Sequence, residues 1–293
     1  MLFDSAAVNF SGPVNIQSRA RGAFKLLKSL VSAPVCTVDL RGAGSEILFA
    51  ESTLRATAGP LAVALGDEAK FEIGKVFSGQ TDALSATDKL TVAAGRKFVA
   101  GLLGVNVRGN AGIHFNLTGD EVSLKSLDGN TFSAAQGSIQ INGSGSKSLL
   151  EIADTQLLFG QSFGITLSGN ENTIKLNKST IGPSSGTASA GITISAGTID
   201  DNGKVEASEV TLRRARFATI GASRSHGSGL LKWEKGTASI AGNLSFEGSG
   251  FTEVKDSSIT SPGTIRIANT TGGSCSGASN SLSAPVLQIC PPF

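Results

Sequence analysis

The chain has 293 residues, of which 40% are hydrophobic and only 16% are charged, and its formal net charge is +2. Soluble globular chains usually carry about 25% charged residues, so this surface must consist largely of uncharged polar side chains. The small net charge gives no support for nucleic-acid binding, and no run of apolar residues is long enough to span a membrane as a helix. Thirty-seven glycines and only eight prolines indicate many short strands that are joined by turns.

The first 34 residues differ from the rest of the chain. After a short alternating stretch, Phe24, Leu27 and Val31 fall on one stripe of an amphipathic helix, which Pro34 would end. A solenoid must cover the open end of its core, and a helix across the first coil does so. We therefore predict that residues 1–34 form an N-terminal cap with one helix.

A short frame recurs along the chain: two apolar residues separated by one residue, four mostly polar residues, and then another apolar residue. Copies begin at Ile47, Leu150, Ile174, Val205 and Thr252. Alternation at period two places the apolar residues on one face of a strand, and the linker of Ser, Thr, Asp and Lys lets the chain turn. Strands and bends repeated in this way wind a chain into a β-solenoid.

The turns between the copies differ in length, which is typical of right-handed parallel β-helices. We therefore predict an all-β right-handed parallel β-helix (β-solenoid) over residues 35–272, with a β-sandwich or jelly roll as the alternative fold. The frame at 251–259, together with the stretches 192–199 and 241–246, resembles coils of right-handed parallel β-helix surface proteins. That group includes bacterial adhesins, filamentous haemagglutinin-type exoproteins and phage tailspikes. The resemblance implies a fold more than a function.

Residues 273–293 form a C-terminal tail that is rich in glycine and serine and contains Cys275 and Cys290. A disulfide between them would stabilise the tail by about 3 kcal/mol and would place the protein in an oxidising compartment. Two free thiols are the alternative. Cys36 lies in an apolar alternating stretch and is expected to be a buried residue of a strand.

Basic residues and the only tryptophan concentrate in neighbouring coils. The predicted binding cluster consists of Arg213, Arg214, Arg216, Arg224, Trp233 and Lys235. If these side chains align, they form a positive face with an aromatic platform, which suits an acidic polysaccharide. Because Trp233 also occupies an apolar position of the frame, an inward orientation is the alternative.

Acidic residues occupy equivalent places in three copies of the frame. The pairs are Glu151 and Asp154, Glu206 and Glu209, and Glu253 and Asp256. Glycoside hydrolysis needs two carboxyl groups about 5–9 Å apart, so a ladder of acids could be catalytic. Solvated side chains at a bend are the alternative for Glu206 and Glu209.

Neither a metal nor a cofactor is expected. The two histidines are far apart, and the sequence contains no Cys-x-x-Cys motif and no glycine-rich phosphate loop.

These features favour a non-enzymatic structural β-solenoid that is extracellular or on a cell or virion surface. We expect it to act as an adhesin or fibre subunit and to associate with itself, with a surface glycan as a further candidate partner. A tailspike-like polysaccharide-degrading enzyme and a non-catalytic carbohydrate-binding module are the alternative functions.

Overall fold

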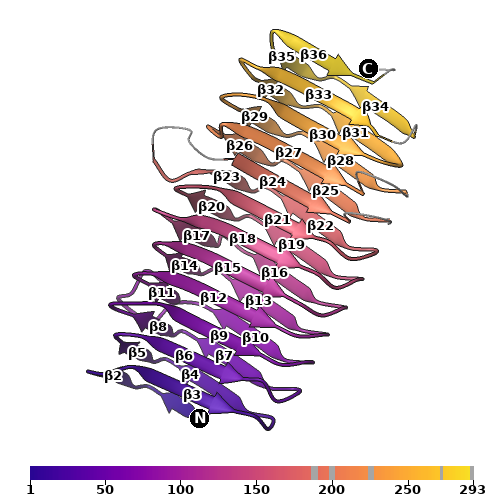
Figure 1. Ribbon diagram of the computed structural model, residues 1–293. Coiled ribbons are helices and arrows are strands. Elements are labelled where there is room, and N and C mark those ends of the chain that lie inside the picture. The colour runs from indigo at the N-terminus through magenta and orange to yellow at the C-terminus, as the bar shows by residue number, and fades with distance from the viewer. Residues whose placement is uncertain (186–190, 198–201, 224–227, 271–272, 291–293) are drawn as a thin grey trace.

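The computed structural model describes residues 1–185, 191–197, 202–223, 228–270 and 273–290. These residues form three 12-stranded sheets, and every described strand pairing is parallel. Each strand pairs with the strands three places before and after it in the chain, so that one strand from each sheet makes one coil. The fold is therefore a parallel β-solenoid, as the recurring frame predicts (Figure 1). The described residues contain no helix, and hence none that could span a membrane.

We name the sheets A, B and C in the order in which the chain enters them. Sheet A consists of β1 (Leu2–Asp4), β4 (Ala23–Leu27), β7 (Glu46–Ala50), β10 (Lys70–Gly74), β13 (Val99–Leu103), β16 (Ser123–Leu127), β19 (Leu149–Ala153), β22 (Thr173–Asn177), β25 (Lys204–Ser208), β28 (Leu230–Glu234), β31 (Phe251–Lys255) and β34 (Ser274–Ala278). Sheet B consists of β2 (Ala7–Asn9), β5 (Leu30–Ala33), β8 (Thr53–Ala56), β11 (Leu84–Ala86), β14 (Asn106–Gly109), β17 (Thr131–Ala134), β20 (Gln156–Phe159), β23 (Thr180–Pro183), β26 (Thr211–Arg213), β29 (Thr237–Ser239), β32 (Ser258–Thr260) and β35 (Ser281–Ser283). Sheet C consists of β3 (Val14–Ser18), β6 (Cys36–Leu40), β9 (Leu61–Leu65), β12 (Lys89–Ala94), β15 (Gly112–Leu117), β18 (Ser138–Gly143), β21 (Phe163–Leu167), β24 (Gly191–Ala196), β27 (Phe217–Ala222), β30 (Leu244–Gly248), β33 (Thr264–Asn269) and β36 (Val286–Ile289).

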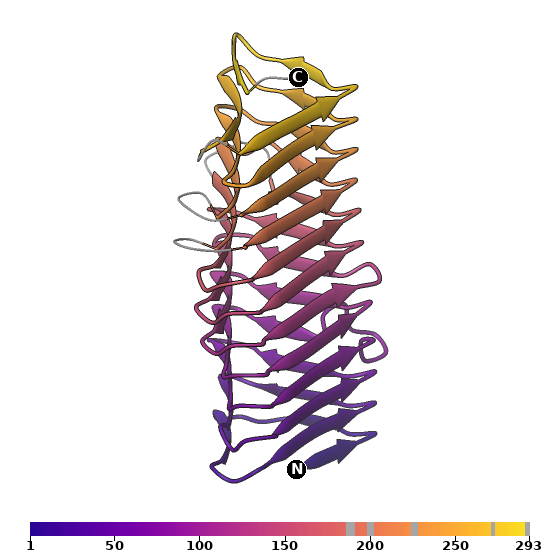
Figure 2. The same cartoon turned by 90° about the vertical axis from the view of Figure 1, so that its right-hand side faces the viewer.

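The coils stack into an elongated rod with the two termini at opposite ends (Figures 1 and 2). The register places equivalent positions of the frame above one another: Leu150 pairs with Ile174 in sheet A, and after the bend Leu157 pairs with Ile181 in sheet B. All four side chains are buried, and together with equivalent residues of the other coils they form one continuous hydrophobic core. Burial of this apolar surface, at about 25 cal/mol per Å², is the main source of stability.

The corner from sheet A to sheet B begins with the same backbone conformation in every coil. The residue after each strand of sheet A has a positive φ, at Ser5, Lys28, Glu51, Lys75, Gly104, Asp128, Asp154, Lys178, Glu209, Lys235, Asp256 and Ser279. A left-handed residue turns the chain within one position, at a cost of about 1–2 kcal/mol when it carries a side chain. The bend of the frame is therefore a one-residue left-handed turn followed by a second strand.

A column of hydroxyl and amide side chains supports this corner from the inside. The Ser29 hydroxyl donates to the Leu27 carbonyl at 2.7 Å and accepts the Ala6 N–H of the preceding coil at 3.1 Å. Asn130 occupies the same place further along, where its amide oxygen accepts the buried Val105 N–H at 2.7 Å. Buried backbone groups that the turn leaves unpaired are satisfied in this way. The polar linker predicted from sequence is thus partly an internal structural element.

The predicted N-terminal helix is wrong, because β4 and β5 occupy that segment. Phe24, Leu26 and Val31 point into the core, and Lys28 makes the left-handed turn between the two strands. The pairing of β4 with β7 and of β5 with β8 extends the solenoid through the proposed cap. Each of the two strands has alternating apolar residues, and the two alternations meet at the bend. Together they happen to give the spacing of an amphipathic helix.

Candidate functional site

The residues of the predicted binding cluster lie at two different corners of the rod. Arg213 ends β26, and Arg214 and Arg216 follow it at the corner between sheets B and C; all three are exposed. Lys235 belongs to the next coil and lies at the corner between sheets A and B. Sheet B therefore separates Lys235 from the arginines, and Arg224 lies outside the described residues. A binding role for these basic residues stays a prediction.

Trp233 cannot form the aromatic platform, because its side chain is 0% exposed. The indole packs against Phe246 with a distance of 5.2 Å between ring centroids. It also lies over Gly236, where an added Cβ would come within 2.1 Å of the indole Nε1. Gly236 occupies the column that holds Ser, Thr or Asn in several other coils, and the missing side chain leaves the space that the indole fills. The inward orientation of Trp233 is thus confirmed.

Charged side chains form a column along the outer face of sheet A. The strand register aligns Lys125, Glu151, Lys175, Glu206, Lys232 and Glu253 in that order. We call this column the charge ladder, because the sign alternates at every step. The Lys125 Nζ lies 3.1 Å from the Glu151 Oε2, and the Lys175 Nζ lies 3.8 Å from the Glu206 Oε2.

In the charge ladder, lysines separate the acidic residues that the sequence suggested as a catalytic ladder. Glu151, Glu206 and Glu253 do share one column, as predicted, but a lysine lies between each of them and the next. The two strands adjacent to Glu206 present Lys175 and Lys232. The nearest acidic residues of the column are two strands away, which places their Cα atoms about 10 Å from that of Glu206 across the sheet.

The corner column from Asp154 to Asp256 alternates in the same way, with Lys178, Glu209 and Lys235 between them. Like charges directly opposite on neighbouring strands are destabilising, and opposite charges contribute about 0.2–1 kcal/mol for each pair. In both columns each acidic residue therefore has a neighbouring lysine, and this arrangement stabilises the stacked coils.

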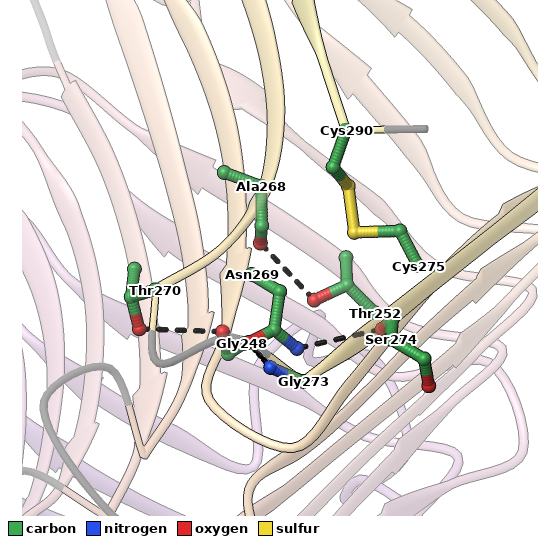
Figure 3. Close-up of a disulfide and its surroundings, with 9 residues drawn as sticks. All are labelled: Gly248, Thr252, Ala268, Asn269, Thr270, Gly273, Ser274, Cys275 and Cys290. Carbon is green, nitrogen blue, oxygen red and sulfur yellow. Dashed lines mark hydrogen bonds between the residues drawn. A yellow bond between two sulfur atoms is a disulfide. The ribbon is translucent and has the colours of Figure 1, made fainter. Parts of the chain in front are cut away.

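The disulfide between Cys275 and Cys290 is confirmed, and it closes the C-terminal end of the core (Figure 3). Cys275 belongs to β34 and pairs with Thr252 in an inward column of sheet A, whereas Cys290 directly follows β36 of sheet C. The bond, with a Cα–Cα distance of 6.1 Å, therefore ties two sheets together across the last coil. The tail predicted at 273–293 thus continues the solenoid through β34, β35 and β36.

Hydrogen bonds fasten the turn next to the disulfide (Figure 3). The buried Thr252 hydroxyl donates to the Ala268 carbonyl at 3.2 Å. The Asn269 amide nitrogen donates to the Ser274 carbonyl at 3.4 Å, and its oxygen accepts the Gly273 N–H at 2.9 Å. The connection from sheet C to β34 is thus held by side chains as well as by the disulfide.

Comparisons with protein families, curated proteins and solved structures found no match. The likeness to adhesins, haemagglutinin-type exoproteins and tailspikes therefore extends to the parallel β-solenoid architecture and no further.

Proposed function

We propose that the protein is a structural rod, on a cell or virion surface or outside the cell, that acts as a fibre subunit or adhesin. The observation that carries this proposal is the continuous core beneath three 12-stranded sheets, which joins all described coils into one elongated body. Such a rod is stiff along its axis, and its outer faces repeat the same kind of side chain at every coil.

The charge ladder supports association with a second copy of the chain. Because its sign alternates from strand to strand, a neighbouring rod displaced by one strand presents opposite charges along the same face. The apolar side chains of Val99 and Leu103, on the same sheet, are 46% and 47% exposed and add hydrophobic surface.

The disulfide supports a location outside the reducing cytoplasm. Disulfides persist in secreted proteins, the periplasm and virion surfaces, where thiols are not kept reduced. The bond between Cys275 and Cys290 would be stable in those compartments and would protect the end of the core there.

Negative-stain electron microscopy of the purified chain tests the proposal. We expect filaments or side-by-side bundles at low ionic strength, and fewer of them at about 0.5 M salt, where the Debye length is only a few ångströms. Lys175→Glu should disperse the bundles because it places three carboxylates in successive positions of the charge ladder. The matched control, Lys89→Glu, changes the same charge on sheet C and should leave them intact. Isolated rods under every condition would contradict the proposal.

A further inference from the structure

A polar cavity of about 200 Å³ lies on the outer face of sheet B, several coils from the predicted binding cluster. Three neighbouring strands, β8, β11 and β14, form its floor. The polar side chains around it belong to Arg55, Asp82, Ser85, Thr87, Arg108 and Asn110.

Two guanidinium groups flank the cavity. Arg55, Ser85 and Arg108 are aligned in one outward column, so the arginines lie on either side of the serine, with their Cα atoms about 10 Å apart across the sheet. Neither arginine forms an ion pair with any described residue, whereas Arg96, elsewhere on the surface, binds Asp67 at 2.9 Å. Both guanidinium groups therefore keep their hydrogen-bond donors available for a ligand.

Asp82 enters the cavity from an inserted segment. Residues 75–83 connect β10 with β11, where two or three residues suffice between sheets A and B in the other coils. The Thr53 hydroxyl donates to the Asp82 carbonyl at 2.9 Å, and the Asn106 amide donates to the Thr81 carbonyl at 2.8 Å. The insertion is thus anchored to both neighbouring strands, and it places Asp82 at the lining of the cavity together with the two arginines.

We propose that this cavity binds a sugar acid, of the kind that gives acidic polysaccharides their negative charge. A ligand carboxylate placed between Arg55 and Arg108 would receive paired N–H donors of the geometry that guanidinium groups provide. The Asp82 carboxylate accepts a hydrogen bond from a ligand hydroxyl, and Ser85, Thr87 and Asn110 can both donate and accept. A simple carboxylate such as acetate has no hydroxyl to offer Asp82.

The size of the cavity agrees with this assignment. Its volume is below the range of about 300–1,000 Å³ that is typical for drug-sized ligands, so it admits about one sugar unit. Neighbouring units of a polymer would extend over the open face of sheet B. This inference does not depend on self-association of the rod, since every copy of the chain carries the complete cavity.

Saturation-transfer NMR and calorimetric titration test the proposal on the full chain. The probes are D-glucuronate, D-galacturonate and N-acetylneuraminate, with D-glucose and acetate for comparison. We expect at least one sugar acid to bind more tightly than both comparison ligands. Arg55→Gln and Arg108→Gln should each weaken that binding about tenfold or more, because each removes charge-assisted hydrogen bonds. The matched control is Arg21→Gln, which removes an exposed arginine at the corner between sheets C and A, outside both the cavity and the predicted binding cluster, and it should bind like the unmodified chain.

Several outcomes would overturn the assignment. Failure of all three sugar acids to bind rejects the site, and an equal loss of affinity in Arg21→Gln reduces the effect to general surface charge. Acetate that binds as tightly as the sugar acid would show a site for small anions only. Unchanged circular dichroism spectra verify that the variants are folded. Asp82→Asn provides a second test, because it should lower the preference for the sugar acid over acetate.

Discussion

At the scale of a single residue, burial in the core lowers the reactivity of the Cys36 thiol. Its thiol lies at an inward position of β6, where the side chain is 1% exposed, as the sequence predicts. Burial raises the pKa of the Cys36 thiol to about 11, although a backbone hydrogen bond acts in the opposite direction. The thiolate is the nucleophilic form of cysteine, so the folded chain should present almost no reactive sulfur at neutral pH.

We therefore predict that Cys36 resists alkylation in the native protein. Incubation with iodoacetamide at pH 8 without reductant should leave the mass unchanged, whereas the same treatment in denaturant should add one adduct. The adduct should be lost in Cys36→Ser, which identifies the modified site. Alkylation of the native protein at the rate of an exposed thiol would contradict the buried position of Cys36.

Asp82 gives a second prediction, on stability against pH. Burial raises the pKa of its carboxyl from 3.8, and nearby Arg108 and Arg55 oppose this effect only in part. The folded chain therefore keeps the proton to a higher pH than the unfolded chain, and stability falls as the pH rises through the folded pKa. Asp82→Asn should accordingly raise the melting temperature at pH 7, and this gain should disappear below about pH 3.8, where the carboxyl is neutral in both states. A lower melting temperature at pH 7 would instead show that attraction to the arginines exceeds the cost of burial.

At the scale of the element, the corner after each strand of sheet A requires a left-handed residue. Lys178 has a φ of 44° at this corner, whereas Lys175 lies within the extended strand β22 of the same coil. We predict that Lys178→Val destabilises the protein by about 1–2 kcal/mol, because β-branched side chains tolerate the left-handed region poorly. Lys175→Val is the matched control and should cost less, since valine favours extended strands. Denaturant unfolding measures both changes, and equal losses of free energy would refute the conformational explanation.

This recurring corner explains how much of the fold could be predicted from the sequence. Inward positions alternate with outward ones in β19 and β22, so copies of the frame at Leu150 and Ile174 indicated the solenoid. The segment around Lys28 follows the same frame, with Phe24 and Leu26 before the turn and Val31 after it. Helical spacing across the turn nevertheless concealed it, because nothing in apolar periodicity alone shows that Lys28 adopts a left-handed conformation.

The cavity on sheet B was harder to predict than the fold, because it depends on the register between coils. Arg55 and Arg108 are far apart in the sequence, and the insertion at 75–83 changes the length of the coil between them. Their common column and the placement of Asp82 follow only from the strand pairing. For Trp233 the sequence contained two conflicting signals. Its apolar position in the frame indicated burial, but the cluster of basic residues around it suggested a surface role.

At the scale of the whole molecule, the solenoid is a stack in which each coil contacts mainly its neighbours. Stability in such an architecture is roughly a sum over coils and the interfaces between them, so an interaction at one end acts locally. The disulfide between Cys275 and Cys290 closes the last coil, and it ties sheet A to sheet C beyond Thr252 and Ile267. Its effect should therefore be largest in β34, β35 and β36.

We predict that the double substitution Cys275→Ser and Cys290→Ser loosens only this end of the rod. The chain-entropy model assigns a disulfide of this loop length about 3 kcal/mol, which corresponds to about a hundredfold faster hydrogen exchange in the affected strands. Exchange measured by mass spectrometry should accelerate in β34–β36 and stay unchanged in central strands such as β16 and β19. Cys36→Ser is the control, because it removes a thiol and leaves the disulfide intact. Loss of protection along the entire rod would mean that the coils unfold as one cooperative unit, and the additive description of the solenoid would then fail.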